Sequence, residues 1–120
     1  MLLININPLI EEIFSNFTVG GKIIPISFLN YTGNSDVYLT YYTWYDKPEN
    51  FYDDENHAEI AFGTIDIYSK GNYKPIEKAL KALLESAGFM WEVERTSEDM
   101  YEDDTKYYHK TLCFSIERSE

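Results

Sequence analysis

Apolar and polar positions alternate most regularly in the middle of the chain, over residues 59–69. This period of two is typical of a β-strand, in which successive side chains point to opposite faces of a sheet. Gly63 lies inside the run and indicates either a bulge or a close approach of another backbone segment. We therefore expect a strand with a structural role at the centre of the fold.

A helix is predicted directly after this strand. Pro75 suits the first turn of a helix, and Gly88 is placed to end it in a left-handed conformation. The apolar positions between them recur at intervals of three and four, which predicts an amphipathic helix with one buried stripe. The expected buried residues are Ile76, Ala79, Leu80, Leu83 and Leu84. The expected solvent-facing residues are Lys74, Lys78 and Lys81.

The N-terminal part of the chain predicts a second helix. Asn7 can cap a helix through its side chain, and Pro8 then occupies the first helical position. Apolar residues recur at helical spacing as far as Phe17, so we expect the helix to end before Gly20 and Gly21.

Two further strands are predicted over residues 26–31 and 37–45, separated by a turn at 32–36. Both alternating faces of residues 37–45 carry aromatic or β-branched side chains, and neither face is clearly polar. We expect such a strand to be covered on both sides. Helices account for one side, and a neighbouring subunit is a natural candidate for the other.

The C-terminal part predicts two strands, over residues 89–96 and 107–117, joined by an acidic loop at 97–106. The complete order is helix, three strands, helix and two strands. This order predicts an α+β fold in one domain over residues 1–120. We expect a mostly antiparallel sheet of about five strands with both helices packed on one face.

Length and cysteine content add little to this fold but exclude some classes of protein. A chain of 120 residues buries roughly two-thirds of its unfolded surface and needs no metal or disulfide for stability. The only cysteine, Cys113, lies in an apolar run, so a buried thiol is expected. The apolar start of the chain stops at Asn5, so neither a secretory signal nor a transmembrane helix is expected.

The charge of the chain is strongly negative, with a formal net charge of −11. Phosphate groups are bound by lysine and arginine, so ordinary binding to nucleic acid or to an anionic membrane is disfavoured. The acidic residues concentrate in two windows, over 46–59 and 92–104, which contain few basic residues.

Aromatic residues are unusually frequent, with 11 tyrosines, 7 phenylalanines and 2 tryptophans. Tyrosine and tryptophan are favoured at protein–protein interfaces because their rings are both apolar and polar at one end. The polar segment 46–56 also contains two aromatic residues, which indicates an interaction arm that orders on assembly. The expected interface residues are Tyr42, Trp44, Phe51, Tyr52, Tyr101 and Tyr107.

Catalytic and metal-binding chemistry is weakly supported. The acidic runs 53–55 and 102–104 could bind a divalent cation, but neither has the spacing of a calcium loop, and solvated acids are the favoured interpretation. His57 and His109 lie near acids or tyrosines, but no serine or cysteine nucleophile is convincingly placed beside them. We therefore expect no enzyme activity, no metal and no cofactor.

Three segments carry a family resemblance: residues 25–44, residues 64–72 and residues 101–109. Together with the intervening helix they resemble the short tail-completion proteins of phages and prophages of Gram-positive bacteria. These are similar to the tail terminators and tail-to-head joining proteins of long-tailed bacteriophages. The resemblance covers most of the chain from Pro25 onward and rests on overall pattern, without a catalytic signature.

The resemblance implies a structural protein of the virion, made in the host cytoplasm and placed at the head–tail junction. Such a subunit forms a ring, commonly a hexamer, that caps the tail tube and meets the head connector. Genomic DNA passes through the ring without specific binding, and an acidic channel would help it slide. No catalytic residue is carried over from the family.

Alternative functions suit the same composition. A DNA mimic that inhibits a nucleic-acid-binding protein would be small, acidic and rich in tyrosine, and would present carboxylates on one convex face. Another neck component, such as a head-closure or minor tail protein, would resemble the same family. A carboxylate-dependent hydrolase would need a concave pocket that gathers acids from separate strands.

Overall fold

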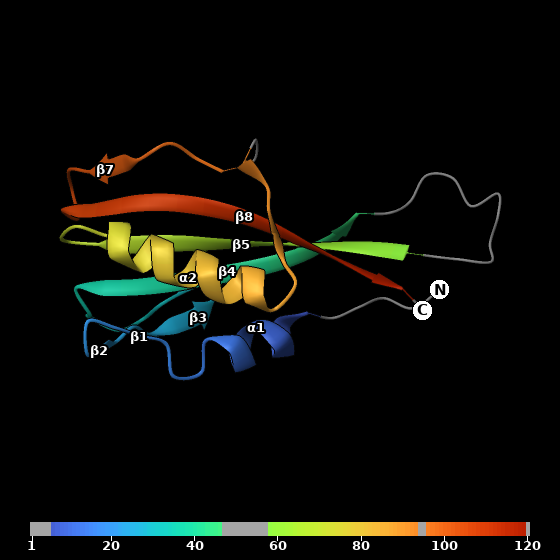
Figure 1. Ribbon diagram of the computed structural model, residues 1–120. Helices are drawn as coiled ribbons and strands as arrows, with labels where there is room; N and C mark the ends of the chain where they lie inside the picture. Colours follow the sequence, from blue (N-terminus) through green and yellow to red (C-terminus); the bar gives the residue numbers. More distant parts are fainter. Residues whose placement is uncertain (1–5, 47–57, 94–95, 120) are drawn as a thin grey trace.

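A computed structural model describes residues 6–46, 58–93 and 96–119. Two helices and eight strands occur in these segments (Figure 1). The elements in chain order are α1 (Asn7–Ile13), β1 (Thr18–Val19), β2 (Lys22–Ile23), β3 (Ile26–Phe28), β4 (Val37–Asp46), β5 (Ala58–Ser69), α2 (Lys74–Ser86), β6 (Met90–Trp91), β7 (Met100–Glu102) and β8 (Tyr107–Ser119).

The main sheet has six strands, and five of them follow the order β3-β4-β5-β8-β6. Strand β7 also pairs with β8, while β1 and β2 form a separate hairpin. Only β3 is parallel to its neighbour in this sheet, and the other pairs are antiparallel. The predicted α+β class with a mostly antiparallel sheet is therefore confirmed.

Strand β5 is the centre of the sheet and pairs with β4 and β8 over most of its length. The register is continuous on both sides of Gly63, so the predicted bulge is wrong. A Cβ atom at Gly63 would approach Thr43 Cγ2 at 3.6 Å and Ile6 Cδ1 at 3.9 Å, which are ordinary contacts. This glycine therefore lies in regular extended backbone, and the fold has room there for a methyl group.

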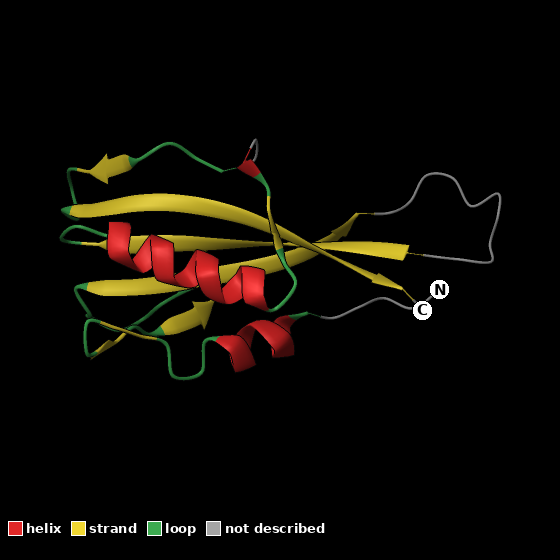
Figure 2. Ribbon diagram, viewed as in Figure 1, coloured by secondary structure: helices red, strands yellow, loops and turns green. Residues whose placement is uncertain are grey.

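Both helices cover the same face of the sheet, as Figure 2 shows. Apolar side chains from α1, α2 and the inner positions of β4, β5 and β8 form one core. The apolar stripe of each helix packs there against the apolar face of the sheet, so the fold consists of one helix layer and one sheet layer. The large and almost fully buried apolar members of this core include Ile6, Phe14, Leu39, Ile65, Ile67, Leu80, Leu84, Leu112 and Phe114.

Helix α2 ends as its sequence predicts. Gly88 has a φ of 97°, a left-handed conformation that costs glycine little. The amide of Phe89 donates to the carbonyl of Leu84 at 2.9 Å, and the amide of Gly88 donates to that of Glu85 at 3.1 Å. These two bonds form a Schellman cap.

Among the described residues, no helix is long and apolar enough to cross a membrane.

Helix α1 is shorter than predicted, because it ends at Ile13 and not near Phe17. The glycines expected to follow the helix form the turn of the β1–β2 hairpin, with φ values of 61° at Gly20 and 78° at Gly21. Two consecutive left-handed residues suit a tight hairpin turn. Asn7 also lies inside the helix, whose N-cap residue is Ile6, and the side chain of Asn7 accepts a hydrogen bond from Thr43.

Three strand predictions also need correction. Strand β3 ends at Phe28, because Leu29 takes a left-handed φ of 63°. Strand β6 covers only residues 90–91 of the predicted 89–96. The predicted acidic loop contains strand β7, which pairs with β8. Hydrogen bonds to β8, such as Ser97 N to the carbonyl of Thr111 at 2.9 Å, keep this segment beside the sheet.

Candidate interaction surfaces

The face of the sheet that carries no helix is rich in aromatic side chains. Side chains alternate along a strand, so every second residue of β4, β5 and β8 points away from the core. We call this surface the aromatic face. Its rings belong to Tyr38, Tyr42, Trp44, Phe62, Tyr68, Tyr107 and His109.

Four rings stack across one end of the aromatic face. Tyr31, from the loop before β4, stacks on Tyr38 with ring centroids 4.3 Å apart. Tyr38 stacks on Tyr68 at 4.8 Å, and Tyr68 stacks on His109 at 4.2 Å. Tyr107 packs edge-on against Tyr38, and its hydroxyl donates to the carbonyl of Ser35 at 2.7 Å. These contacts fix the rings across three strands and one loop.

A second group of rings lies further along the same strands. Trp44 stacks between Tyr42 at 5.3 Å and Phe62 at 5.4 Å, measured between ring centroids. Phe62 is buried and Trp44 is half-buried, whereas Tyr42 is 42% exposed. The exposed ring therefore rests on a rigid aromatic support, as binding residues at interfaces often do.

A polar cluster lies between the two groups of rings. His109 Nε2 is 3.0 Å from Asp66 Oδ1, and its Nδ1 is 3.8 Å from Glu102 Oε2. Thr111 donates a hydrogen bond to the same oxygen of Asp66. Both ring nitrogens of His109 thus face carboxylates, and one ring surface is covered by Tyr68. The arrangement holds β5, β7 and β8 together and leaves neither nitrogen directed at a substrate.

Burial and nearby charge make two tyrosines of this face harder to ionise. Burial raises the pKa of Tyr68 from 10.0 to about 12, and the negative charge of Asp66 adds to the shift. Burial also raises the pKa of Tyr38, with a further contribution from Tyr107. Both phenols therefore remain hydrogen-bond donors at neutral pH.

The predicted interface residues do not form one surface. Tyr42, Trp44 and Tyr107 belong to the aromatic face. Tyr101 pairs with Tyr108 on the helix-bearing side of the sheet, with ring centroids 4.9 Å apart. The predicted Phe51, Tyr52 and His57, the acidic run 53–55 and the proposed interaction arm lie outside the described residues. Tyr68 was not among the predicted interface residues, although the alternation of β5 carried the signal.

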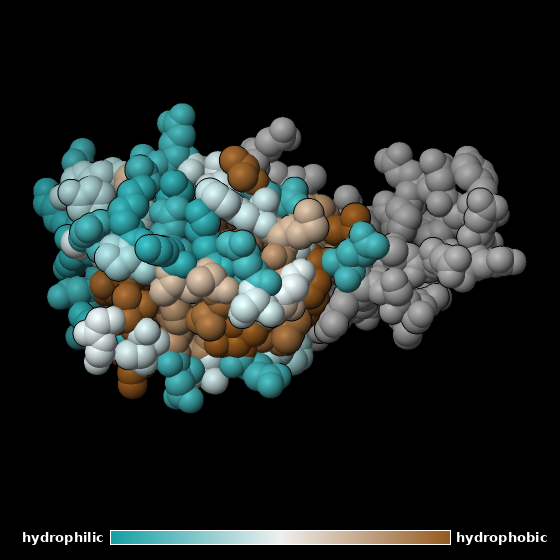
Figure 3. Space-filling model, viewed as in Figure 1, coloured by the Kyte–Doolittle hydropathy of each residue, from teal (hydrophilic) through white to brown (hydrophobic). Residues whose placement is uncertain are grey.

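A groove lies on the opposite, helix-bearing side of the molecule, between α1 and α2. We call it the helix groove, and it has a volume of about 390 Å³. Figure 3 shows apolar side chains gathered along this part of the surface. The groove is lined by Ile13, Ser15, Asn16, Phe17, Thr18, Ala79 and Leu83. Leu83 is 36% exposed, so the prediction that it is buried is wrong.

The lysines of α2 line a separate depression of about 310 Å³ on another side of the helix, together with Glu77, Ala82 and Glu85. Lys78 is exposed, and Lys74 forms ion pairs with Asp99 at 3.3 Å and Glu77 at 3.8 Å. Lys81 lies over the ring of Trp91, with Nζ 3.2 Å from the ring centroid. The predicted solvent-facing row is therefore present, although Lys81 is half-buried.

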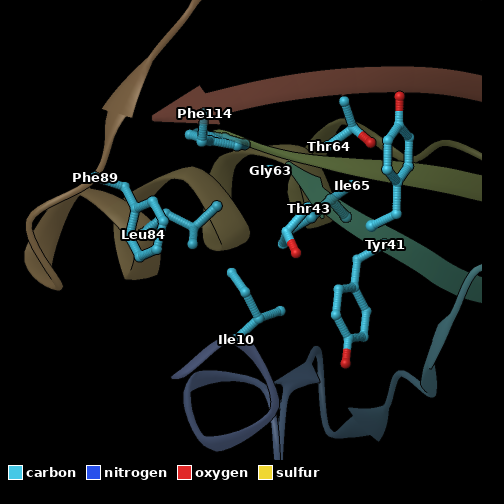
Figure 4. A pocket seen from close by; sticks show the side chains of 10 residues that line it. Ile10, Tyr41, Thr43, Gly63, Thr64, Ile65, Leu84, Phe89 and Phe114 are labelled. Atoms are coloured by element: carbon cyan, nitrogen blue, oxygen red, sulfur yellow. The ribbon is translucent and has the colours of Figure 1, made fainter. Parts of the chain in front are cut away.

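Neither a ligand cavity beside Gly63 nor a metal centre appears in the described part of the chain. The space beneath Gly63, lined by Ile10, Leu84 and Phe114 among others, is too small to hold a water molecule (Figure 4). Within residues 6–46, 58–93 and 96–119, no three histidine, cysteine or acidic residues are grouped to bind a metal ion. The predicted buried thiol at Cys113 is confirmed, with 1% exposure.

The geometry thus presents two candidate interaction surfaces on opposite sides of a two-layer fold. Comparison with known proteins adds no assignment to them. No protein-family model matches the chain, and no curated protein matches it either.

Proposed function

We propose that this protein is a structural subunit of the head–tail junction of a long-tailed phage. In this proposal, copies of the chain assemble into a ring, with six as the favoured number. The ring caps the tail tube, meets the head connector and lets genomic DNA pass through. The proposal combines the sequence resemblance with one structural observation, the aromatic face.

The aromatic face carries the proposal for a physical reason. An antiparallel sheet with helices on one side usually turns polar residues toward water on the other. Here that other side carries rings on three central strands, at Tyr38, Tyr42 and Trp44 of β4, Phe62 and Tyr68 of β5, and Tyr107 and His109 of β8. Tyrosine and tryptophan on a rigid support are typical of protein interfaces. A second protein layer against this face therefore explains the residues better than solvent does.

The negative charge suits a ring through which DNA moves. With a formal net charge of −11, the subunit offers few cations to phosphate groups, so DNA would gain little by binding to the channel. A DNA mimic is less well supported. Such a protein needs free carboxylates in a regular array, whereas Asp66 contacts His109 and Thr111, and Asp99 contacts Lys74 and Lys110.

Electron microscopy of particles made without this protein tests the proposal. The gene is deleted from the phage or prophage, and the particles are compared with those of a strain complemented by the wild-type gene. The expected result is tails of abnormal length or tails without heads, because the tube is neither capped nor joined. Normal virions from the deletion strain would refute the proposed function.

A further inference from the structure

We infer that residues 96–102 form a latch that opens and closes over one edge of β8, and that Asp99 holds this latch shut. The latch lies beside β8 and ends in strand β7 (Figure 1). It opens and closes within a single subunit, so the inference does not depend on the proposed function.

The latch covers the edge of β8 that faces away from β5. Residues 100–102 pair with residues 107–109 as a short antiparallel strand. Further along, the amide of Ser97 donates to the carbonyl of Thr111 at 2.9 Å. The amide of Thr111 donates to the hydroxyl of Ser97 at 2.8 Å, where a regular ladder would offer a backbone carbonyl. The latch therefore satisfies this edge partly through side chains and is not a continuous strand.

The latch contains no buried side chain. Residues 96–102 are all exposed or half-buried, and the large side chains of Met100 and Tyr101 are 40% and 48% exposed. By contrast, Ile65 and Leu112, which lie opposite each other on β5 and β8, are 1% and 0% exposed. A segment with little buried apolar surface opens at a lower free energy than the core. The latch is therefore expected to open while the central strands stay paired.

Asp99 fastens the latch to the rest of the fold. One oxygen of its carboxylate lies 3.3 Å from Nζ of Lys74 on α2 and 3.3 Å from Nζ of Lys110 on β8. The hydroxyl of Tyr73, a residue that is 5% exposed, donates a hydrogen bond to the same oxygen. Hydrogen bonds to a charged group are stronger than those between neutral groups. Removal of this one charge therefore weakens all three contacts together.

Opening of the latch changes what β8 presents to its surroundings. The backbone N–H and C=O groups along its outer edge lose the partners that residues 96–102 supply. A strand edge without partners can pair with another strand. The closed latch therefore keeps this edge from pairing, and its opening makes the edge available.

Native-state amide hydrogen exchange, followed by nuclear magnetic resonance, measures the opening. The amides of Ser97 and Thr111 are compared with the amide of Ile65 at several low urea concentrations, after correction for intrinsic exchange rates. Ser97 and Thr111 are expected to exchange at least about tenfold faster than Ile65 and with little dependence on urea, because opening of the latch exposes little surface.

A destabilised core separates opening of the latch from unfolding of the whole fold. Leu80→Ala removes a fully buried side chain, which is 0% exposed. It is expected to accelerate exchange at Ile65 by about a hundredfold, because this amide exchanges through global unfolding. The rates at Ser97 and Thr111 are expected to stay close to those of the wild type, since the latch opens without unfolding the core.

A matched pair of variants tests the role of Asp99. Asp99→Asn and Glu98→Gln each remove one negative charge from an exposed position of the latch. Asp99→Asn is expected to accelerate exchange at Ser97 and Thr111 roughly tenfold, because two ion pairs are lost and the hydrogen bond from Tyr73 loses its charged acceptor. Glu98→Gln is expected to leave both rates within about twofold of the wild type.

Two results would overturn the latch itself. One is exchange at Ser97 and Thr111 that is no faster than at Ile65. The other is an equal acceleration of all three amides by Leu80→Ala, since residues 96–102 would then open only when the whole fold unfolds. Asp99→Asn rates that match those of Glu98→Gln would overturn the role given to Asp99. None of these results bears on the head–tail function, which the deletion strain tests separately.

Discussion

Leu80 and Leu83 of helix α2 provide a matched test of the structure, because the same substitution is expected to have different effects at the two positions. Both belong to the apolar stripe that the sequence predicts to be buried. In the structure Leu80 is 0% exposed, whereas Leu83 is 36% exposed at the helix groove. We therefore compare Leu80→Ala with Leu83→Ala in dilute protein, so that self-association does not contribute to stability.

The expected magnitudes follow from the atoms removed. Leucine to alanine deletes three carbons, worth about 2.4 kcal/mol at about 0.8 kcal/mol each when they are fully buried. At Leu80 a cavity term adds to this loss, so the expected total is about 3 to 4 kcal/mol. At Leu83 part of the side chain is already in water and the groove is open, so the expected loss is about 1 kcal/mol.

Urea denaturation followed by far-ultraviolet circular dichroism measures both values. The denaturant slope should stay constant across the variants, so that a change in midpoint reports a change in stability. The expected difference of at least about 2 kcal/mol corresponds to roughly a 30-fold change in the unfolding equilibrium. Equal losses at the two positions would contradict the placement of α2 against the sheet and the groove beside it.

Three further predictions concern single positions. Gly63→Ala should raise the free energy of unfolding by about 0.5 to 1 kcal/mol, because extended backbone with room for a methyl group favours alanine over glycine; a large loss in urea denaturation would contradict the described packing. Gly88→Ala should lower it by about 1 kcal/mol, because alanine is strained at a φ of 97°, and an unchanged midpoint would argue against the Schellman cap. Tyr68 has a folded pKa of about 12 against 10.0, so its stabilising effect is complete below pH 10 and is lost as the pH rises through 12. As the pH rises from about 10 to about 12, Tyr68→Phe should therefore lose less stability than the wild type, and parallel pH profiles would contradict the burial of this phenol.

Part of the fold could be predicted because local sequence determined it. The alternation of residues 59–69 predicts a strand, and the helical spacing between Pro75 and Gly88 predicts a helix. Both elements are present in the structure. The end of α1 could not be predicted, because Gly20 and Gly21 suit a helix stop and a hairpin turn equally well. Phe17 continues the helical spacing, yet it packs on Phe14 from outside the helix, with ring centroids 5.2 Å apart.

The sequence showed that the candidate surfaces would be aromatic and acidic, but it did not show which residues lie side by side on them. The aromatic residues of β4 led to the prediction that Tyr42 and Trp44 are interface residues, since a strand with two apolar faces needs cover on both, and the structure places both rings on the aromatic face. The pairing of Asp66 with His109 joins residues 43 positions apart, and sequence alone does not supply that register. The helix groove depends on how α1 lies beside α2, so the exposure of Leu83 follows only from the three-dimensional arrangement.

Electron microscopy of particles that carry Tyr42→Glu tests the central claim most directly, because it joins the aromatic face to the proposed place of the protein in the virion. Particles from a strain with Asn72→Glu, at an exposed loop position outside the aromatic face, serve as the control. The account predicts that Tyr42→Glu, although folded, reproduces the tails of abnormal length or without heads expected from the deletion. Normal virions from the Tyr42→Glu strain would contradict the claim that this face builds the head–tail junction.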